Sequence, residues 1–228
     1  MKRAAAEAAA DLVRDGMRVG LGSGSTSQEF VKCLGRRVER GLNIIGVASS
    51  SATAELARQV GIPLAEHDAL LDLAVDGADA IARDTLAAIK GLGGALARER
   101  LIAESAFEFV IIADEGKVFD RLDDSRPAIP VPVEVLPFGW KLTRDRLAAH
   151  GRPKLRLDAV GEPLRTDNGN VIVDLYDSDY SSLGALAAGI KLLSGVVDHG
   201  LFLDLATSVI VGTPAGVIQL DSSSRASG

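Results

Sequence analysis

The segment Met17-Arg-Val-Gly-Leu-Gly-Ser-Gly-Ser-Thr26 decides the fold. Met17 to Leu21 is a short apolar run typical of a strand, and Gly22-Ser23-Gly24 interrupts it. An apolar stripe at helical spacing follows from Ser25 onward. Ser25 and Gln28 also have the spacing of a capping box, in which two side chains satisfy free backbone groups at a helix start. The segment therefore predicts a buried strand that passes through a glycine turn into a helix.

The same alternation of strand and helix patterns continues on both sides of this segment. Helices are predicted over 2–15, 51–60 and 94–106, and strands over 43–48, 71–75 and 109–113. This order favours a Rossmann-like parallel sheet with helices on both faces. Polar motifs follow Leu21, Val75 and Ala113. Because ligands bind beyond the carboxyl ends of such strands, we expect these motifs to converge on one site.

A proline-rich segment from Pro127 to Pro132 marks a change of pattern. The predicted order after it is strand 131–136, helix 138–150, strands 154–158 and 170–175, helix 181–193 and strand 196–203. This β-α-β-β-α-β order is typical of a ferredoxin-like fold, and the apolar run 208–211 is expected to return to the first sheet. The predicted domains are a Rossmann-like catalytic domain over 1–130 and 204–220, a smaller ferredoxin-like α+β domain over 131–203, and a flexible tail over 221–228.

The composition narrows the function classes. The chain has 228 residues, of which 47% are hydrophobic and 25% charged, as in ordinary globular proteins. A net charge of −6 argues against a broad nucleic-acid-binding surface but permits a local site for one phosphate. Cys33 is the single cysteine, so no intrachain disulfide is possible. Glu7 and Asp11 interrupt any apolar leader, and no apolar run reaches about 18 residues. We expect a cytoplasmic protein without membrane contact.

The glycine turn from Gly22 to Thr26 is a candidate phosphate site. Free backbone N–H groups at a helix start, together with serine and threonine hydroxyls, suit an anion. The turn lacks the Walker lysine, and Ser25 occupies the third-glycine position of the dinucleotide fingerprint. Lys117 follows another predicted strand and is a second candidate for the phosphate. The alternatives are a purely structural strand-to-helix turn and a solvated lysine.

Two further motifs contain candidate catalytic groups. In Asp76-Gly77-Ala78-Asp79, two carboxylates can converge on one polar ligand or metal, or they can simply cap a turn. In the segment from Lys90 to Gly94, glycines allow close backbone approach, and Lys90 can stabilise an oxyanion. Glu99 lies in an apolar stripe, where desolvation would raise its pKa toward that of a general base, unless it forms a salt bridge with Arg98 or another basic residue. The histidines are scattered, and no zinc, iron or triad pattern appears.

Taken together, these stretches resemble the type A ribose-5-phosphate isomerase family. The resemblance runs from about Lys2 to Gln219 and includes 22–26, 76–79, 89–91, 98–99, 113–117, 132–135, 166–170 and 212–214. It implies interconversion of ribose 5-phosphate and ribulose 5-phosphate in the pentose phosphate pathway, through an enediolate. It also implies no metal, no other cofactor, and a homodimer or homotetramer.

The resemblance assigns roles to individual positions. It implies that Glu99 moves a proton between C2 and C1, that Asp76 or Asp79 assists ring opening, and that Lys90 stabilises the enediolate. The residues expected to bind substrate are Ser23, Gly24, Ser25, Thr26, Asp76, Gly77, Ala78, Asp79, Lys90, Gly91, Leu92, Gly93, Lys117 and Lys2.

Two positions depart from the family pattern. Ala80 replaces a usual glutamate, and Leu92 replaces a usual glycine, which leaves substrate preference and rate open. We expect Leu92 to keep a negative φ, with its side chain turned into the protein and its N–H facing the substrate.

Two other functions compete with isomerisation. One is an acyl-CoA transferase in which Glu99 acts as a nucleophile. The other is a sugar-phosphate-sensing domain without catalysis, against which the pair Lys90 and Glu99 argues. Incubation with an acyl-CoA separates the first from isomerisation, because a glutamyl thioester would appear by mass.

Overall fold

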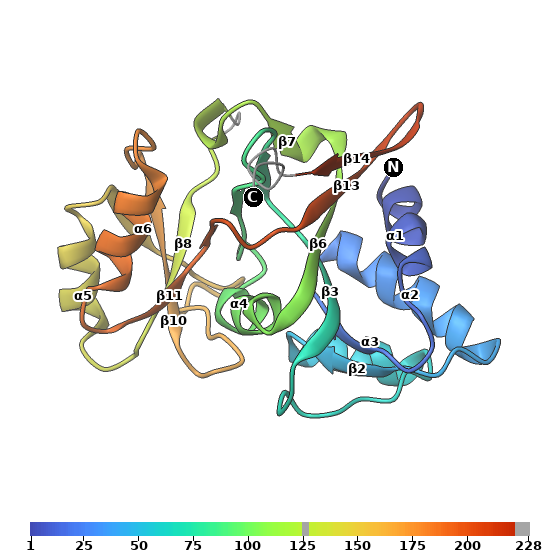
Figure 1. Cartoon of the computed structure of the whole chain (residues 1–228). Helices are drawn as coiled ribbons and strands as arrows, with labels where there is room; N and C mark the ends of the chain where they lie inside the picture. The colour runs from blue at the N-terminus through green and yellow to red at the C-terminus, as the bar shows by residue number, and fades with distance from the viewer. Residues whose placement is uncertain (125–127, 222–228) are drawn as a thin grey trace.

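A six-stranded sheet forms the centre of the larger part of the molecule (Figure 1). The computed structural model describes residues 1–124 and 128–221. The strand order is β14 (Gly216–Asp221), β13 (Ser208–Thr213), β6 (Ala106–Asp114), β3 (Leu71–Gly77), β1 (Arg18–Leu21) and β2 (Ile45–Ala48). All neighbouring pairs are parallel except the hairpin β13–β14. The predicted return of 208–211 to the first sheet is therefore confirmed, whereas β14 was not predicted.

The two faces of this sheet are covered differently. Helices α1 (Lys2–Asp11), α2 (Ser25–Glu39) and α3 (Ser51–Gln59) pack on one face, and α4 (Leu96–Glu104) packs on the other. Side chains alternate between the faces, so that Leu73 and Val75 meet the first group of helices while Ala74 faces the second side. On the second side α4 shares the cover with a small sheet, so the expectation of helices on both faces holds only in part.

A separate antiparallel sheet lies beyond α4. Its order is β11 (Val196–His199), β8 (Val131–Val135), β10 (Val171–Tyr176) and β9 (Arg152–Leu155), with helices α5 (Trp140–Leu147) and α6 (Leu183–Lys191). The element order is the predicted one, but the single strand expected over 196–203 is two strands divided by Gly200. A side chain at Gly200 would collide with the backbone carbonyl of Lys90, 2.1 Å from its Cβ position. The glycine therefore lets the chain cross to the next sheet.

The third sheet joins the other two. It consists of β12 (Leu201–Phe202), β5 (Ala88–Ile89), β4 (Ala80–Ala82) and β7 (Val118–Phe119), followed in the chain by a 3-10 turn at Leu122–Asp124. Strands of two or three residues are too short to show a periodicity, which is why β4, β5 and β7 were not predicted and β12 was predicted only as part of the strand 196–203. Ala80 lies in β4, fully buried in the core that this sheet shares with the antiparallel sheet.

Three terminal features of elements differ from prediction. Gly24, with φ +88°, is the N-cap of α2, and no side chain caps the helix, so the predicted capping box of Ser25 and Gln28 is wrong. Helix α1 ends at Asp11 rather than at residue 15. Asp221 belongs to β14, while Pro127 and the rest of the predicted tail lie outside the described residues. Among the helices of the described ranges, none is long and apolar enough to cross a membrane.

Candidate active site

A cavity of about 130 Å³ lies at the carboxyl ends of β1 and β3. It is lined by Lys2, Ser23, Gly24, Ser25, Thr26, Gly77, Ala78, Asp79, Lys90, Gly91, Gly93, Glu99 and Lys117. The polar motifs expected to converge do lie together here. Of the residues expected to bind substrate, Asp76 and Leu92 do not line the cavity.

The loop after β1 is held tightly against β3. A side chain at Gly22 would overlap the Asp76 carboxylate, only 2.0 Å from the Cβ position, so only glycine fits there. The Ser23 N–H donates to Asp76 Oδ1 at 2.9 Å, and the Ser23 hydroxyl lies 2.7 Å from that of Ser49 and 2.9 Å from that of Ser50. These contacts place the N-terminus of α2 at the cavity, where its dipole favours an anion.

Two lysines reach this anion-favouring end from distant elements. Lys2 Nζ donates to the Ser25 hydroxyl at 2.9 Å. Its position depends on Gly212, because a Cβ there would lie 2.1 Å from the Met1 carbonyl oxygen. Lys117 comes from the 3-10 turn Glu115–Lys117, directly after β6. The cavity therefore combines a helix N-terminus with two cations at one end.

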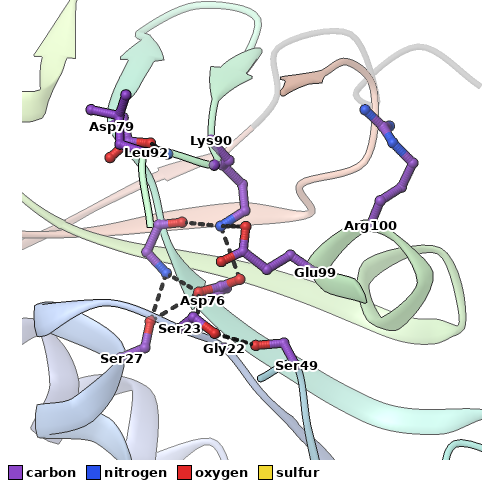
Figure 2. Close-up of polar contacts among 12 residues, drawn as sticks. Gly22, Ser23, Ser27, Ser49, Asp76, Asp79, Lys90, Leu92, Glu99 and Arg100 are labelled. Atoms are coloured by element: carbon purple, nitrogen blue, oxygen red, sulfur yellow. Dashed lines mark hydrogen bonds and ion pairs between the residues drawn. The ribbon is translucent and has the colours of Figure 1, made fainter. Parts of the chain in front are cut away.

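Asp76 is a buried acceptor rather than a cavity-lining group (Figure 2). Its side chain is only 5% exposed. Besides the Ser23 N–H, Oδ1 accepts from the Ser27 hydroxyl at 2.9 Å and the Gly77 N–H at 2.7 Å. Oδ2 forms an ion pair with Lys90 Nζ at 2.9 Å. Both oxygens of this carboxylate are thus engaged by protein, and its negative charge holds Lys90 in place.

Lys90 is the buried cation of the site. It is 2% exposed, and its Nζ donates to the Gly77 carbonyl and lies 3.4 Å from Glu99 Oε2. The ammonium also sits 5.4 Å from the centroid of the Phe202 ring. Burial lowers the pKa of Lys90, but the carboxyl groups of Asp76 and Glu99 raise it further, and the net pKa lies above the usual lysine range. Lys90 therefore stays positively charged at physiological pH.

Glu99 lies on α4 with its carboxyl group beside this ammonium. Burial, followed by the negative charge of Asp76, raises the pKa of Glu99 to about 8, and Lys90 opposes the rise. Oε2 receives no hydrogen bond from any described residue, although it lies at ion-pair distance from Lys90. Of the salt-bridge partners that the alternative named, Arg98 contacts Asp167 and Asn168 instead, and the basic residue at ion-pair distance from Glu99 is Lys90. A carboxyl group that titrates near neutrality with an uncommitted oxygen can accept and return a proton.

Asp79 and Leu92 meet at the other end of the cavity. Asp79 lines the cavity, and its Oδ2 accepts from the Leu92 N–H at 3.0 Å. The positive φ angles of this loop belong to Gly91 and Gly94, so Leu92 avoids them as expected. However, the Leu92 side chain is 42% exposed rather than turned into the protein, and its N–H binds Asp79. The expected packing of Leu92 into the protein is therefore wrong.

Several supporting residues were missed by the sequence reasoning. Arg156 donates to the carbonyls of both Gly91 and Leu92 and pairs with Asp174. These contacts tie the loop from Lys90 to Gly94, called the 90s loop below, to the antiparallel sheet. No local pattern identifies such a distant arginine. Ser49 and Ser50, in contrast, directly follow a predicted strand, so the rule about carboxyl strand ends would have indicated them.

Comparison with known proteins gives consistent matches over nearly the whole chain. Residues 45–216 match the profile of the family described as Ribose 5-phosphate isomerase A (phosphoriboisomerase A). The chain is 48% identical to "Ribose-5-phosphate isomerase A" of Thermomicrobium roseum, over 97% of this chain and 94% of that protein. It is 46% identical to the protein of the same name in Gluconobacter oxydans, over 95% and 94%.

Solved structures agree with these matches. The structure of ribose 5-phosphate isomerase A from Methanocaldococcus jannaschii is similar with a TM-score of 0.92 and 37% identity, covering 97% of this chain and 98% of that one. A D-ribose-5-phosphate isomerase in complex with phospho-erythronic acid gives a TM-score of 0.90 and 37% identity, covering 96% and 97%.

Proposed function

Because the chain belongs to the ribose 5-phosphate isomerase A family, we propose that it interconverts ribose 5-phosphate and ribulose 5-phosphate through an enediolate, with Glu99 as the general base. The observation that carries this mechanism is the buried contact between Lys90 and Glu99 on the cavity wall. It pairs a proton acceptor of near-neutral pKa with a permanent positive charge. An enediolate mechanism requires both.

The phosphate group is assigned to the end of the cavity formed by residues 23–26, Lys2 and Lys117. The N-terminus of α2 supplies backbone N–H groups and the positive end of its dipole there. Two ammonium groups add charge that a phosphate can neutralise. This end holds the substrate while the sugar carbons lie toward Lys90 and Glu99.

Ring opening is assigned to Asp79. Opening the cyclic form breaks the bond between C1 and the ring oxygen: a carboxylate takes the proton from the C1 hydroxyl, and the same carboxyl group can return that proton to the ring oxygen. Asp76 is a poor candidate, because its oxygens are bound by Ser23, Ser27, Gly77 and Lys90 inside the protein. Asp79 lines the cavity, and among the described residues its carboxylate accepts a hydrogen bond from the N–H of Leu92 alone. The geometry therefore favours Asp79 for this step and a charge-holding role for Asp76.

Proton transfer between the carbons is assigned to Glu99. As a carboxylate it takes the proton from C2 of the open-chain aldose, which leaves an enediolate, and it then returns the proton to C1 to give the ketose. Between these two steps the hydroxyl proton moves from O2 to O1. We assign this transfer to Asp79, which lines the cavity. Lys90 stays protonated throughout and stabilises the negative oxygen.

The two departures from the family pattern do not touch the proposed reaction. Ala80 is fully buried in β4, and the Leu92 side chain lies outside the cavity wall. Neither side chain is placed to select a different sugar phosphate, which supports ribose 5-phosphate as the substrate. Family membership also disfavours the acyl-CoA transferase and sensing alternatives. A Rossmann-like domain with a ferredoxin-like domain over 131–203, a cytoplasmic location and an assembly of two or four copies remain part of this proposal.

The test is a direct assay of ribulose 5-phosphate formation from ribose 5-phosphate across the pH range. Since Glu99 must be unprotonated to act as a base, kcat/KM should rise with pH, with an apparent pKa of about 8, and then level off. Phospho-erythronate, whose carboxylate resembles the enediolate in charge, should inhibit competitively. The absence of turnover on ribose 5-phosphate by the folded protein would refute the proposal.

A further inference from the structure

We propose that the turn Thr166–Asn170 is a clamp, with Asp167 as the positioning residue that fixes Glu99 relative to the phosphate loop 22–26. The proposal rests on the function proposed above. Asp167 Oδ2 accepts the Ser51 N–H at 2.6 Å and lies 3.6 Å from Arg98 Nη1. Arg98 also donates to the Asp167 carbonyl at 2.9 Å and to Asn168 Oδ1 at 2.8 Å. One turn thus contacts both α3 and α4, which are separated in the chain by three strands.

The two helices carry opposite ends of the site. Ser51 begins α3, and the two serines before it form the hydroxyl contacts to Ser23 in the phosphate loop. Arg98 lies on α4, immediately before Glu99. A single carboxylate, that of Asp167, therefore connects the phosphate end to the base end.

The turn itself is held by a buried carboxylate, that of Glu134 on β8. Glu134 is 0% exposed, and its Oε1 accepts from Thr166 Oγ1 at 2.9 Å, Asn168 Nδ2 at 3.0 Å and Asn170 Nδ2 at 2.7 Å. Its Oε2 has no hydrogen-bond partner among the described residues. Burying a carboxylate in a strand of valines costs stability that an apolar residue would not. We infer that this cost is tolerated because the carboxylate fixes one conformation of the turn.

A second cavity explains why the two helices need such a link. It has a volume of about 330 Å³ and lies next to the first, sharing Ser23, Gly24 and Gly93 with it. Thr166, Asp167 and Ser50 form part of its wall. Packed side chains therefore do not fill the space between α3, α4 and the turn, and the polar contacts of Asp167 and Arg98 set the separation.

This geometry has a kinetic consequence. A substrate held by its phosphate presents C2 at a fixed distance, and a misplacement of about 1 Å can lower a rate by roughly 10²-fold. Asp167→Ala should therefore lower kcat by roughly 10–100-fold. Binding of inorganic phosphate, which needs only the loop, should change less than about twofold, whereas phospho-erythronate, which spans both ends, should bind at least about tenfold more weakly.

The experiment compares five variants with the wild type: Asp167→Ala, Asp167→Asn, Arg98→Met, the double variant of Asp167→Ala with Arg98→Met, and Arg165→Ala. Arg165 is the matched control, because it lies on the same hairpin and lines the second cavity, but among the described residues its side chain donates only to the Gly169 carbonyl of its own turn. For each we would measure kcat, KM, the melting temperature, and the Kd of phosphate and of phospho-erythronate by calorimetry. Asp167→Asn keeps an acceptor for the Ser51 N–H and should recover part of the lost rate.

Two results would overturn the clamp. The first is a kcat within about twofold of wild type in Arg98→Met, whose side chain is 37% exposed in the wild type and can be replaced without opening the core. The second is an equal loss of phosphate and phospho-erythronate binding, which indicates a general structural defect. Supporting results are normal behaviour of Arg165→Ala and losses in Asp167→Ala and Arg98→Met that do not add in the double variant. An inactive wild type would refute the proposed function instead, because the two Kd values do not depend on turnover.

Discussion

Replacing Lys90 by methionine removes the ammonium from the site while keeping most of the apolar stem. In the wild type, Nζ lies 2.9 Å from Asp76 Oδ2 and 3.4 Å from Glu99 Oε2, and the carboxyl side chains are each 5% exposed. The variant leaves two buried carboxyl groups without their cation. Removing one partner of a buried pair typically costs about 3–5 kcal/mol, so we expect the free energy of unfolding to fall by that amount.

The same change should alter the pH dependence. Lys90 is the group that lowers the pKa of Glu99, so without it the pKa should rise above about 8. A glutamate whose folded pKa is raised above its ordinary value makes the folded state bind more protons. Its contribution to stability is therefore lost as pH rises through the folded pKa. The destabilisation of Lys90→Met should be larger at about pH 9 than at about pH 6.

The assays are urea unfolding at these two pH values and kcat/KM as a function of pH. We expect the ascending limb of the profile to move to higher pH and the maximal rate to fall by roughly 10²–10³-fold, the loss typical of one oxyanion donor. Lys117→Met is the stability control, because Lys117 lines the same cavity outside the buried cluster. The coupling between Asp76, Lys90 and Glu99 would be refuted if Lys90→Met and wild type had equal free energies of unfolding and if kcat/KM rose at the same pH in both.

The remaining predictions concern ground-state binding, the 90s loop and the source of positive charge. Lys117→Ala and Thr26→Ala should each raise KM by roughly 10–150-fold, the value of one charge-assisted hydrogen bond, and initial-rate measurements showing a fall in kcat alone would contradict this. Leu92→Gly should leave ribose 5-phosphate turnover nearly unchanged and reduce the free energy of unfolding by about 0.5–1 kcal/mol through added chain entropy; a large gain in turnover would show that leucine obstructs the site. Isomerisation should persist in EDTA because Lys90 supplies the charge that stabilises the enediolate, and loss of activity reversed by a divalent ion would disprove this.

The central sheet was predictable because its strands are long enough to show a pattern. Apolar runs such as 71–75 and 109–113 carry enough residues, and the glycine turn at 22–24 separates strand from helix clearly. The third sheet was not predictable, since its strands have two or three residues and pair only through long-range contacts. The hairpin strand β14 was also missed, because its pattern of exposed residues gives no buried face.

The convergence of motifs at the cavity followed from one rule about parallel sheets. Residues 22–26 and 117 follow strands of the central sheet and 76–79 lie at the carboxyl end of β3, so their meeting did not require any knowledge of contacts. The different roles of Asp76 and Asp79 could not be predicted, because they depend on which of the two carboxylates accepts the hydrogen bond from Ser27 and pairs with Lys90. The hydrogen bonds from Arg156 to the carbonyls of Gly91 and Leu92 could not be predicted either, because they also depend on three-dimensional packing.

The most direct test of the central claim is exchange of the C2 hydrogen of ribose 5-phosphate in D₂O, followed by NMR, in wild type and Glu99→Gln. Glutamine keeps the shape of the side chain but cannot act as the base. The account predicts that Glu99→Gln still binds phospho-erythronate while exchange and isomerisation both fall by at least roughly 10²–10⁴-fold. Exchange at a near wild-type rate in Glu99→Gln would contradict it and move the role of base to another carboxylate, with Asp79 the first candidate.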